Sequence, residues 1–129
     1  MAIGAIAREF DRAVDDLQAL FFYLPLMHDE TLVSQIACIA LSEALAARCQ
    51  RAGHERAFVL RSIGFAKQHR DTILRFGRFP SRNEVLGRQS TEEEREFLKL
   101  NPAGWVVSAD KAGEQEGEGS EKAKARDEL

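Results

Sequence analysis

The stretch HERAFVLRSIGFAKQHRDTILRFG, residues 54–77, decides the fold class of this chain. Its apolar side chains recur at steps of three or four residues, which is the period of one face of an α-helix. Gly77 is typical of the residue that ends a helix. The pattern predicts a long helix over residues 54–76, with one face that carries Phe58, Ser62, Phe65, His69, Ile73 and Phe76.

Two more long helices are expected before this stretch. Pro25 should end the first, because proline disfavours helical backbone in the residue before it. The second should begin at Asp29 as its N-cap and close at Gly53. The apolar face of the first should carry Ile3, Ile6, Phe10, Val14, Leu17, Phe21 and Leu24. The buried face of the second should carry Leu32, Ile36, Ile39, Ala40 and Leu45.

Shorter helices should follow residue 77. Ser81 and Glu84 fit the S-x-x-E capping box, which predicts a short turn of helix over residues 82–86. Ser90 or Thr91 should cap a further helix that opens with three glutamates, since acidic side chains are favourable near the positive end of the helix dipole.

No segment alternates polar and apolar residues well enough to predict a strand. We therefore expect an all-α fold, an antiparallel array of three long helices plus short ones, in a single domain over residues 1–107. Residues 108–129 contain no aromatic residue and a single leucine, so we expect them to form a disordered acidic tail.

The net charge of −3 is concentrated in this tail, because the preceding residues hold 14 acidic and 14 basic side chains. A neutral body with an acidic tail is not typical of proteins that bind nucleic acid or an anionic membrane. No apolar run is long enough to span a bilayer, and charged residues occur too early for a signal peptide.

Cys38 and Cys49 lie in one predicted helix, about 16 Å apart, which is too far for a disulfide. Two reduced, buried thiols suit a cytoplasmic protein. The final residues, RDEL, resemble a retention signal of the endoplasmic reticulum, but no route into that compartment is visible and we interpret them as a coincidence.

Two motifs resemble a known family. FFYLPLMHDETL (21–32) and HRDTILRFGRFPSRNEVLGRQSTEEEREFL (69–98) are similar to the C-terminal half of the bacterial family called domain of unknown function nine-two-four. The resemblance covers roughly residues 11–100 and implies a tetratricopeptide-like array of helical repeats. The family's L-D-Q-F-P-R-N motif is absent, which implies that the N-terminal half of the family domain is missing. The resemblance implies no biochemical activity.

His28, Glu30 and His69 are candidate ligand-binding residues. They could act as acid, base or metal ligands, or they could form a helix cap beside a buried histidine. The chain has three histidines and no H-E-x-x-H or C-x-x-C motif, so we expect neither a metal site nor a cofactor. The structural interpretation is favoured.

Arg78, Arg82, Asn83 and Arg88 are the second set of candidate ligand-binding residues. Guanidinium groups near helix N-termini could hold a phosphate or a carboxylate. They could instead pair with glutamates and satisfy the backbone of an irregular loop. The second interpretation is favoured because so much loop backbone needs partners.

Phe22 and Tyr23 are candidate partner contacts. Adjacent residues on a helix point about 100° apart, so if Phe21 faces the core, these two rings need another surface. Since we find no convincing nucleophile or catalytic set, the favoured hypothesis is a protein-interaction module that forms a homodimer or binds another protein. The alternative is an enzyme or binder of an anionic small molecule that uses the arginine-rich loop.

Overall fold

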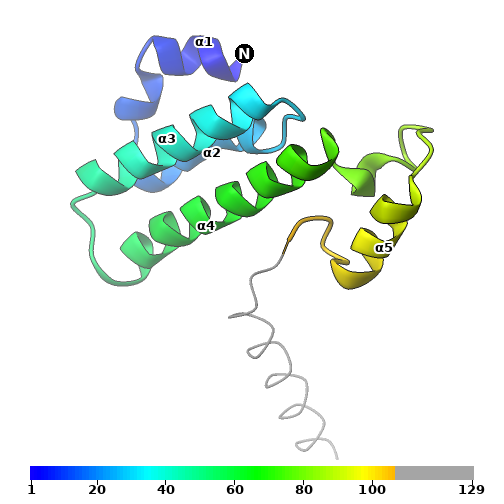
Figure 1. Ribbon diagram of the computed structural model, residues 1–129. Coiled ribbons are helices and arrows are strands. Elements are labelled where there is room, and N and C mark those ends of the chain that lie inside the picture. Colours follow the sequence, from blue (N-terminus) through cyan, green and yellow to red (C-terminus); the bar gives the residue numbers. More distant parts are fainter. Residues whose placement is uncertain (107–129) are drawn as a thin grey trace, which may run out of the picture.

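The computed structural model describes residues 1–106, and every regular element in that part of the chain is helical (Figure 1). The all-α prediction is confirmed. The predicted tail, residues 108–129, lies outside the described residues. In chain order the elements are α1 (Ala2–Ala7), the 3₁₀ helix η1 (Phe10–Arg12), α2 (Asp16–Met27), α3 (Leu32–Arg48), α4 (Gly53–Phe76), the 3₁₀ helix η2 (Pro80–Arg82) and α5 (Glu92–Leu100).

The three long helices α2, α3 and α4 form the body of the domain, and α3 packs against both of the others (Figure 1). The core lies between them. α5 lies beyond the C-terminal end of α4, where the ring of Phe97 meets that of Phe76 at 4.9 Å. Within residues 1–106, no helix is long and apolar enough to cross a membrane. Cys38 and Cys49 are both buried free thiols, as predicted.

The first predicted helix is wrong, because the chain breaks between α1 and α2. Glu9 adopts a left-handed conformation with φ of 59°, which ends the helical path. Asp15 then starts α2 as the N-cap and forms a capping box with Gln18. The sequence analysis missed this break because the spacing of the apolar residues continues across it. Asp15 and Gln18, which form the capping box, lie between positions of the apolar face.

Pro25 does not end α2 as predicted but lies inside its last turn. A proline in a helix removes one backbone hydrogen bond and crowds the carbonyl four residues earlier. That carbonyl belongs to Phe21, whose residue is 70% exposed, so water can reach this side of the helix. The exposed position near the end of the helix explains why the proline is tolerated.

Gly53 was expected to close α3 but is the first residue of α4, and α3 itself ends at Arg48. The start of α3 also differs from the prediction. Its N-cap is Thr31, and the Asp29 carboxylate accepts hydrogen bonds from the hydroxyls of Thr31 and Ser34. These bonds lower the pKa of Asp29. Glu30 therefore lies before the helix rather than in its first turn, where its side chain can reach other elements.

The loop after α4 keeps one predicted feature and lacks another. Gly77 ends α4 with φ of 71°, as expected for a glycine at this position. The expected capping box of Ser81 and Glu84 is absent, because the short helix there is η2, which begins at Pro80. Of the two caps predicted for α5, Ser90 and Thr91, the structure uses Thr91, which forms a capping box with Glu94.

A three-membered polar network joins η1 to α2 and α3. The Tyr23 hydroxyl donates to the Asp11 carboxylate at 2.6 Å, and the guanidinium of Arg48 donates to the Tyr23 hydroxyl at 3.2 Å. Asp11 is 4% exposed and Tyr23 is 1% exposed. Burial and the Asp11 hydrogen bond raise the pKa of Tyr23. This network holds Tyr23 in the core and contradicts its predicted outward position.

Candidate functional site

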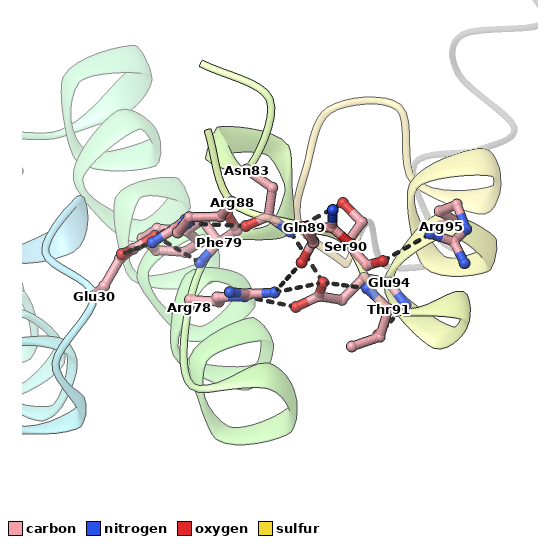
Figure 2. Close-up of polar contacts among 10 residues, drawn as sticks. All are labelled: Glu30, Arg78, Phe79, Asn83, Arg88, Gln89, Ser90, Thr91, Glu94 and Arg95. Atoms are coloured by element: carbon pink, nitrogen blue, oxygen red, sulfur yellow. Dashed lines mark hydrogen bonds and ion pairs between the residues drawn. The ribbon is translucent and has the colours of Figure 1, made fainter. Parts of the chain in front are cut away.

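The arginine-rich loop between α4 and α5 is built around buried Glu94 (Figure 2). The Arg78 guanidinium donates to both carboxylate oxygens of Glu94, at 2.8 and 3.0 Å. The side-chain amide of Asn83 and the backbone amide of Thr91 donate to the same carboxylate. One glutamate from α5 therefore holds two loop residues and the start of its own helix.

A second carboxylate ties this loop to the turn between α2 and α3. Glu30 accepts two hydrogen bonds from the Arg88 guanidinium, at 2.7 and 2.9 Å, and one from the backbone amide of Phe79 (Figure 2). Arg88 also donates to the side-chain oxygen of Asn83 at 3.0 Å. Asn83, which is 1% exposed, therefore connects the Glu94 cluster with the Glu30 cluster.

Pairing with an arginine lowers the pKa of both glutamates. Hydrogen bonds from Arg88 lower the pKa of Glu30 to about 2, and hydrogen bonds from Arg78 lower the pKa of Glu94 to about 2. Both carboxylates are ionised at neutral pH, and the same pairing raises the pKa of both arginines. The loop is thus a set of charges that are already neutralised by partners within the protein.

Arg82 faces a different neighbour. Its guanidinium donates to the backbone carbonyl of His28 at 2.6 Å and lies over the ring of Phe79, 4.8 Å from the ring centre. It therefore fastens the loop to the C-terminal end of α2. Arg78, Arg82 and Arg88 thus all have acceptors within the protein, and the acceptor of Arg82 is the backbone carbonyl of His28.

His69 is buried within a group of aromatic rings. Its ring stacks on Trp105 at 4.6 Å and meets the rings of His28 and Phe79 edge-on at 5.3 and 5.6 Å. Its Nδ1 lies 2.7 Å from the backbone oxygen of Phe65, which can only accept, so Nδ1 carries the proton. Burial lowers the pKa of His69, so the ring is neutral at neutral pH. Its Nε2 then carries no proton and can accept a hydrogen bond.

Trp105 reaches this position because the chain turns back after α5. Gly104 lies in the left-handed region with φ of 91°, and a Cβ atom there would lie 2.7 Å from the Ser81 Oγ. Only glycine fits so close an approach. The turn therefore depends on Gly104 and places the single tryptophan of the chain over His69.

A pocket of about 290 Å³ opens beside His69, between α2 and α4. Among residues 1–106, the side chains of its wall are almost entirely apolar and include no lysine, arginine, aspartate or glutamate. The residues that line it are Leu17, Leu20, Phe21, Tyr23, Leu24, Met27, His28, Ser42, Phe58, Ser62, Phe65, His69 and Trp105.

The pocket explains why the predicted internal faces were only half right. Phe21, Phe58 and Phe65 were expected in the core but are 70%, 51% and 37% exposed, and they form the pocket wall instead. The core side of α2 carries Tyr23, and that of α4 carries Val59. Both helices have a second apolar face, and side-chain periodicity does not show which of the two is buried.

The predicted partner contacts are corrected by the same observation. Tyr23 is buried and hydrogen-bonded, and Phe22 is partly buried and packs against the core. Neither offers the free aromatic surface that we expected. Phe21, which the sequence placed inside, is the exposed ring of this run.

The sequence singled out His69 and His28 but missed Ser42 and Trp105. Ser42 looked like an ordinary polar residue within a helix, and Trp105 follows the last predicted helix. The position of Ser42 on the core-facing side of an apolar helix is the sequence feature that could have pointed to it. Within residues 1–106, no group of three or more histidine, cysteine, aspartate or glutamate side chains could hold a metal ion.

Comparison with known families matches residues 1–101 to the family described as "Bacterial protein of unknown function (DUF924)". The chain belongs to the DUF924 family. The match begins at residue 1, so the expectation that the resemblance is limited to the C-terminal half of the family domain is not borne out. The tetratricopeptide-like character that the resemblance implied stays a prediction.

A solved structure of a protein of unknown function, ATU0120 from Agrobacterium tumefaciens, is similar to this DUF924 chain, with 37% sequence identity and a TM-score of 0.63. The match covers 78% of this chain and 49% of that chain. The chain thus spans about half the length of this relative. No curated protein matches.

Proposed function

We propose that this DUF924 chain is a protein-interaction module that pairs with a second copy of itself through the outer face of α3. The observation that carries the proposal is an exposed apolar stripe along one side of that helix. We call it the outer α3 face, and it consists of Val33, Ile36, Ala40, Ala44 and Ala47, all of which are exposed. Ile36 and Ala40 were predicted on the buried face of this helix, and that prediction is wrong. Val33 is 78% exposed and Ile36 is 54% exposed.

The shape of this face suits an antiparallel pair. Its bulky residues, Val33 and Ile36, lie in the N-terminal half of α3, and its small residues, Ala40, Ala44 and Ala47, follow. Two copies related by a two-fold axis would place the bulky half of one helix against the small half of the other. A self-complementary patch is what a two-fold interface requires.

Charge does not oppose such a pair. Glu43 and Arg48 are the only charged residues in the sequence of α3. Arg48 turns toward Asp11 and Tyr23, and Glu43 pairs with Lys67 at 3.4 Å. The outer α3 face would therefore bring no unpaired like charges together.

The expected dimer is weak. A helix of 17 residues is about 25 Å long, and one such helix pair buries less than the roughly 800 Å² per partner of a standard interface. Sedimentation velocity from micromolar to millimolar chain concentration should show a mass that rises from one copy toward two.

Two variants test the surface. Ile36→Glu should abolish the rise in mass because it buries a charge in the pair, while Leu74→Glu, which changes an exposed leucine of α4, should leave the rise unchanged. A single-copy mass at every concentration, or an equal effect of both variants, would contradict the proposal. Circular dichroism checks that both variants are folded.

The alternative function, an anionic ligand held by the arginine-rich loop, finds less support. Arg78 and Arg88 already hold the carboxylates of Glu94 and Glu30, and Arg82 holds the carbonyl of His28. A phosphate or carboxylate ligand would have to displace these partners. The geometry supports a structural role for the loop better than a binding role.

A further inference from the structure

Two residues of the pocket between α2 and α4, Ser42 and His69, have a polar side-chain atom without a hydrogen-bond partner within residues 1–106. Ser42 is 1% exposed, and its Oγ forms no hydrogen bond within residues 1–106. Burial raises the pKa of the Cys38 thiol, and the Ser42 hydroxyl nearby lowers it in part. His69 is 4% exposed, and its Nε2 forms no hydrogen bond within residues 1–106. A buried polar atom is normally paired, so the Ser42 Oγ calls for an explanation.

Both residues line the same pocket, and their helices, α3 and α4, pack together. The Nε2 atom can only accept a hydrogen bond while the ring is neutral, and a serine hydroxyl can donate or accept. A hydroxyl group of a ligand can therefore donate to His69 or accept from Ser42.

We propose that this pocket is a binding site for a small, uncharged aromatic molecule that carries one hydroxyl group. The aromatic preference follows from the wall, which is rich in rings: Phe21, Tyr23, Phe58, Phe65 and Trp105. The absence of charge follows from a wall without lysine, arginine, aspartate or glutamate, where an ionised group would be buried without a partner.

The size of the pocket limits the ligand. Its volume of about 290 Å³ is at the lower end of the range for ligand sites, roughly 300–1,000 Å³. A phenol with a short alkyl group is of suitable size and chemistry. Peptide helices and larger cofactors are not.

This site is separate from the proposed protein contact. The outer α3 face, defined by Val33, Ile36, Ala40, Ala44 and Ala47, shares no residue with the pocket wall. Failure of the self-association test would leave the pocket unaffected, and failure of the ligand test would leave the dimer proposal unaffected.

The test uses para-propylphenol as the probe and para-propylanisole, whose hydroxyl is capped by a methyl group, as its matched control. Binding to the full chain is followed by calorimetry and by the fluorescence of Trp105, the single tryptophan of the chain, which lies in the pocket wall. We expect saturable one-to-one binding of the phenol in the micromolar to millimolar range. The anisole should bind at least tenfold more weakly, because it cannot donate to His69.

Two pairs of variants locate the binding. Ser42→Ala should weaken phenol binding about tenfold, whereas Ser62→Ala should change it less, because the Ser62 hydroxyl already donates to the Val59 carbonyl at 2.6 Å. His69→Gln should reduce binding more than His54→Gln, since His54 is exposed and outside the pocket.

Three outcomes would overturn the proposal. These are no saturable binding of the phenol, equal affinity for phenol and anisole, and full affinity in Ser42→Ala. Stronger binding of para-propylbenzoate than of the phenol would also overturn it, since that result would assign an anionic ligand to the pocket.

Discussion

In the arginine-rich loop, the polar side chains of Arg78, Asn83, Arg88 and Glu94 have partners within the protein. In the pocket between α2 and α4, about 290 Å³ in volume, Ser42 Oγ and His69 Nε2 have no hydrogen-bond partner among residues 1–106. The sequence pointed to the first region, because charged residues are conspicuous. The second offers more to a ligand, because binding gains most where buried groups are still unpaired. Substitutions in the loop should therefore change stability, and substitutions in the pocket should change binding.

The largest expected effect is acid destabilisation through the loop. Glu30 and Glu94 have a pKa of about 2 in the folded protein, below the ordinary value of 4.5 that the unfolded chain should show. The stability that they contribute is therefore complete above about pH 4.5 and is lost as the pH falls toward 2 and below. The loss should be on the order of 3 kcal/mol for buried Glu94, with a smaller share from half-buried Glu30.

Urea unfolding followed by circular dichroism between pH 7 and pH 2 measures this effect. A double variant, Glu30→Gln with Glu94→Gln, should show a flatter dependence on pH than the natural chain. An equally steep fall in both proteins would place the acid-sensitive groups elsewhere.

The next effect concerns the centre of the loop. Glu94→Gln should destabilise the fold by about 2–4 kcal/mol, since it leaves the Arg78 guanidinium without its counter-charge and disturbs the bond from Asn83. The neighbouring Glu93 bonds Arg75 in an exposed position, so Glu93→Gln should cost about 0.5 kcal/mol or less. Similar losses in the two variants would show that the loop is not held by Glu94.

A smaller effect is expected where the loop meets the pocket. Gly104→Ala should destabilise the fold by about 1–2 kcal/mol, because its backbone is left-handed and a Cβ atom would collide with Ser81. Trp105 fluorescence should shift as the ring moves away from His69. Gly64→Ala is the control: a Cβ on Gly64 meets nothing within 4 Å. It should leave the tryptophan signal unchanged, and a signal unchanged in both variants would contradict the role of Gly104.

The smallest effect has the opposite sign. Ser42→Ala should leave stability unchanged or raise it by up to about 1 kcal/mol, because it removes a buried hydroxyl that has no partner. The same change should weaken phenol binding, so stability and binding would move in opposite directions. Thermal unfolding without ligand measures the first, and a clear loss of stability would show that the hydroxyl has a structural partner.

Helix existence was predictable here and helix boundaries were less so. The long helix over residues 54–76 was predicted almost to the residue, because Gly77 stops it in a conformation that few other residues accept. The break at Glu9 was missed, because the apolar spacing continues across it. The start of α3 was misplaced because Asp29 and Thr31 are both good caps, and the hydrogen bonds among Asp29, Thr31 and Ser34 decide between them.

The candidate site was predictable only in part. His69 was expected to be a buried histidine with a partner, and it is, through the carbonyl of Phe65. The pairing of the arginines with glutamates was the favoured interpretation, but Glu30 and Arg88 are 58 residues apart, and spacing alone could not match them. The pocket was not predicted at all, since it requires the positions of three helices.

By itself, the sequence determined that the chain is helical, that its longest helix ends at Gly77, and that its loop holds arginines and glutamates able to pair. These features depend on local backbone preferences and on side-chain chemistry, which neighbouring residues show directly. Only the tertiary structure decided which apolar face of α2 and α4 enters the core and which lines the pocket. Local periodicity cannot make that choice, because a helix with two apolar faces buries whichever one its distant neighbours cover.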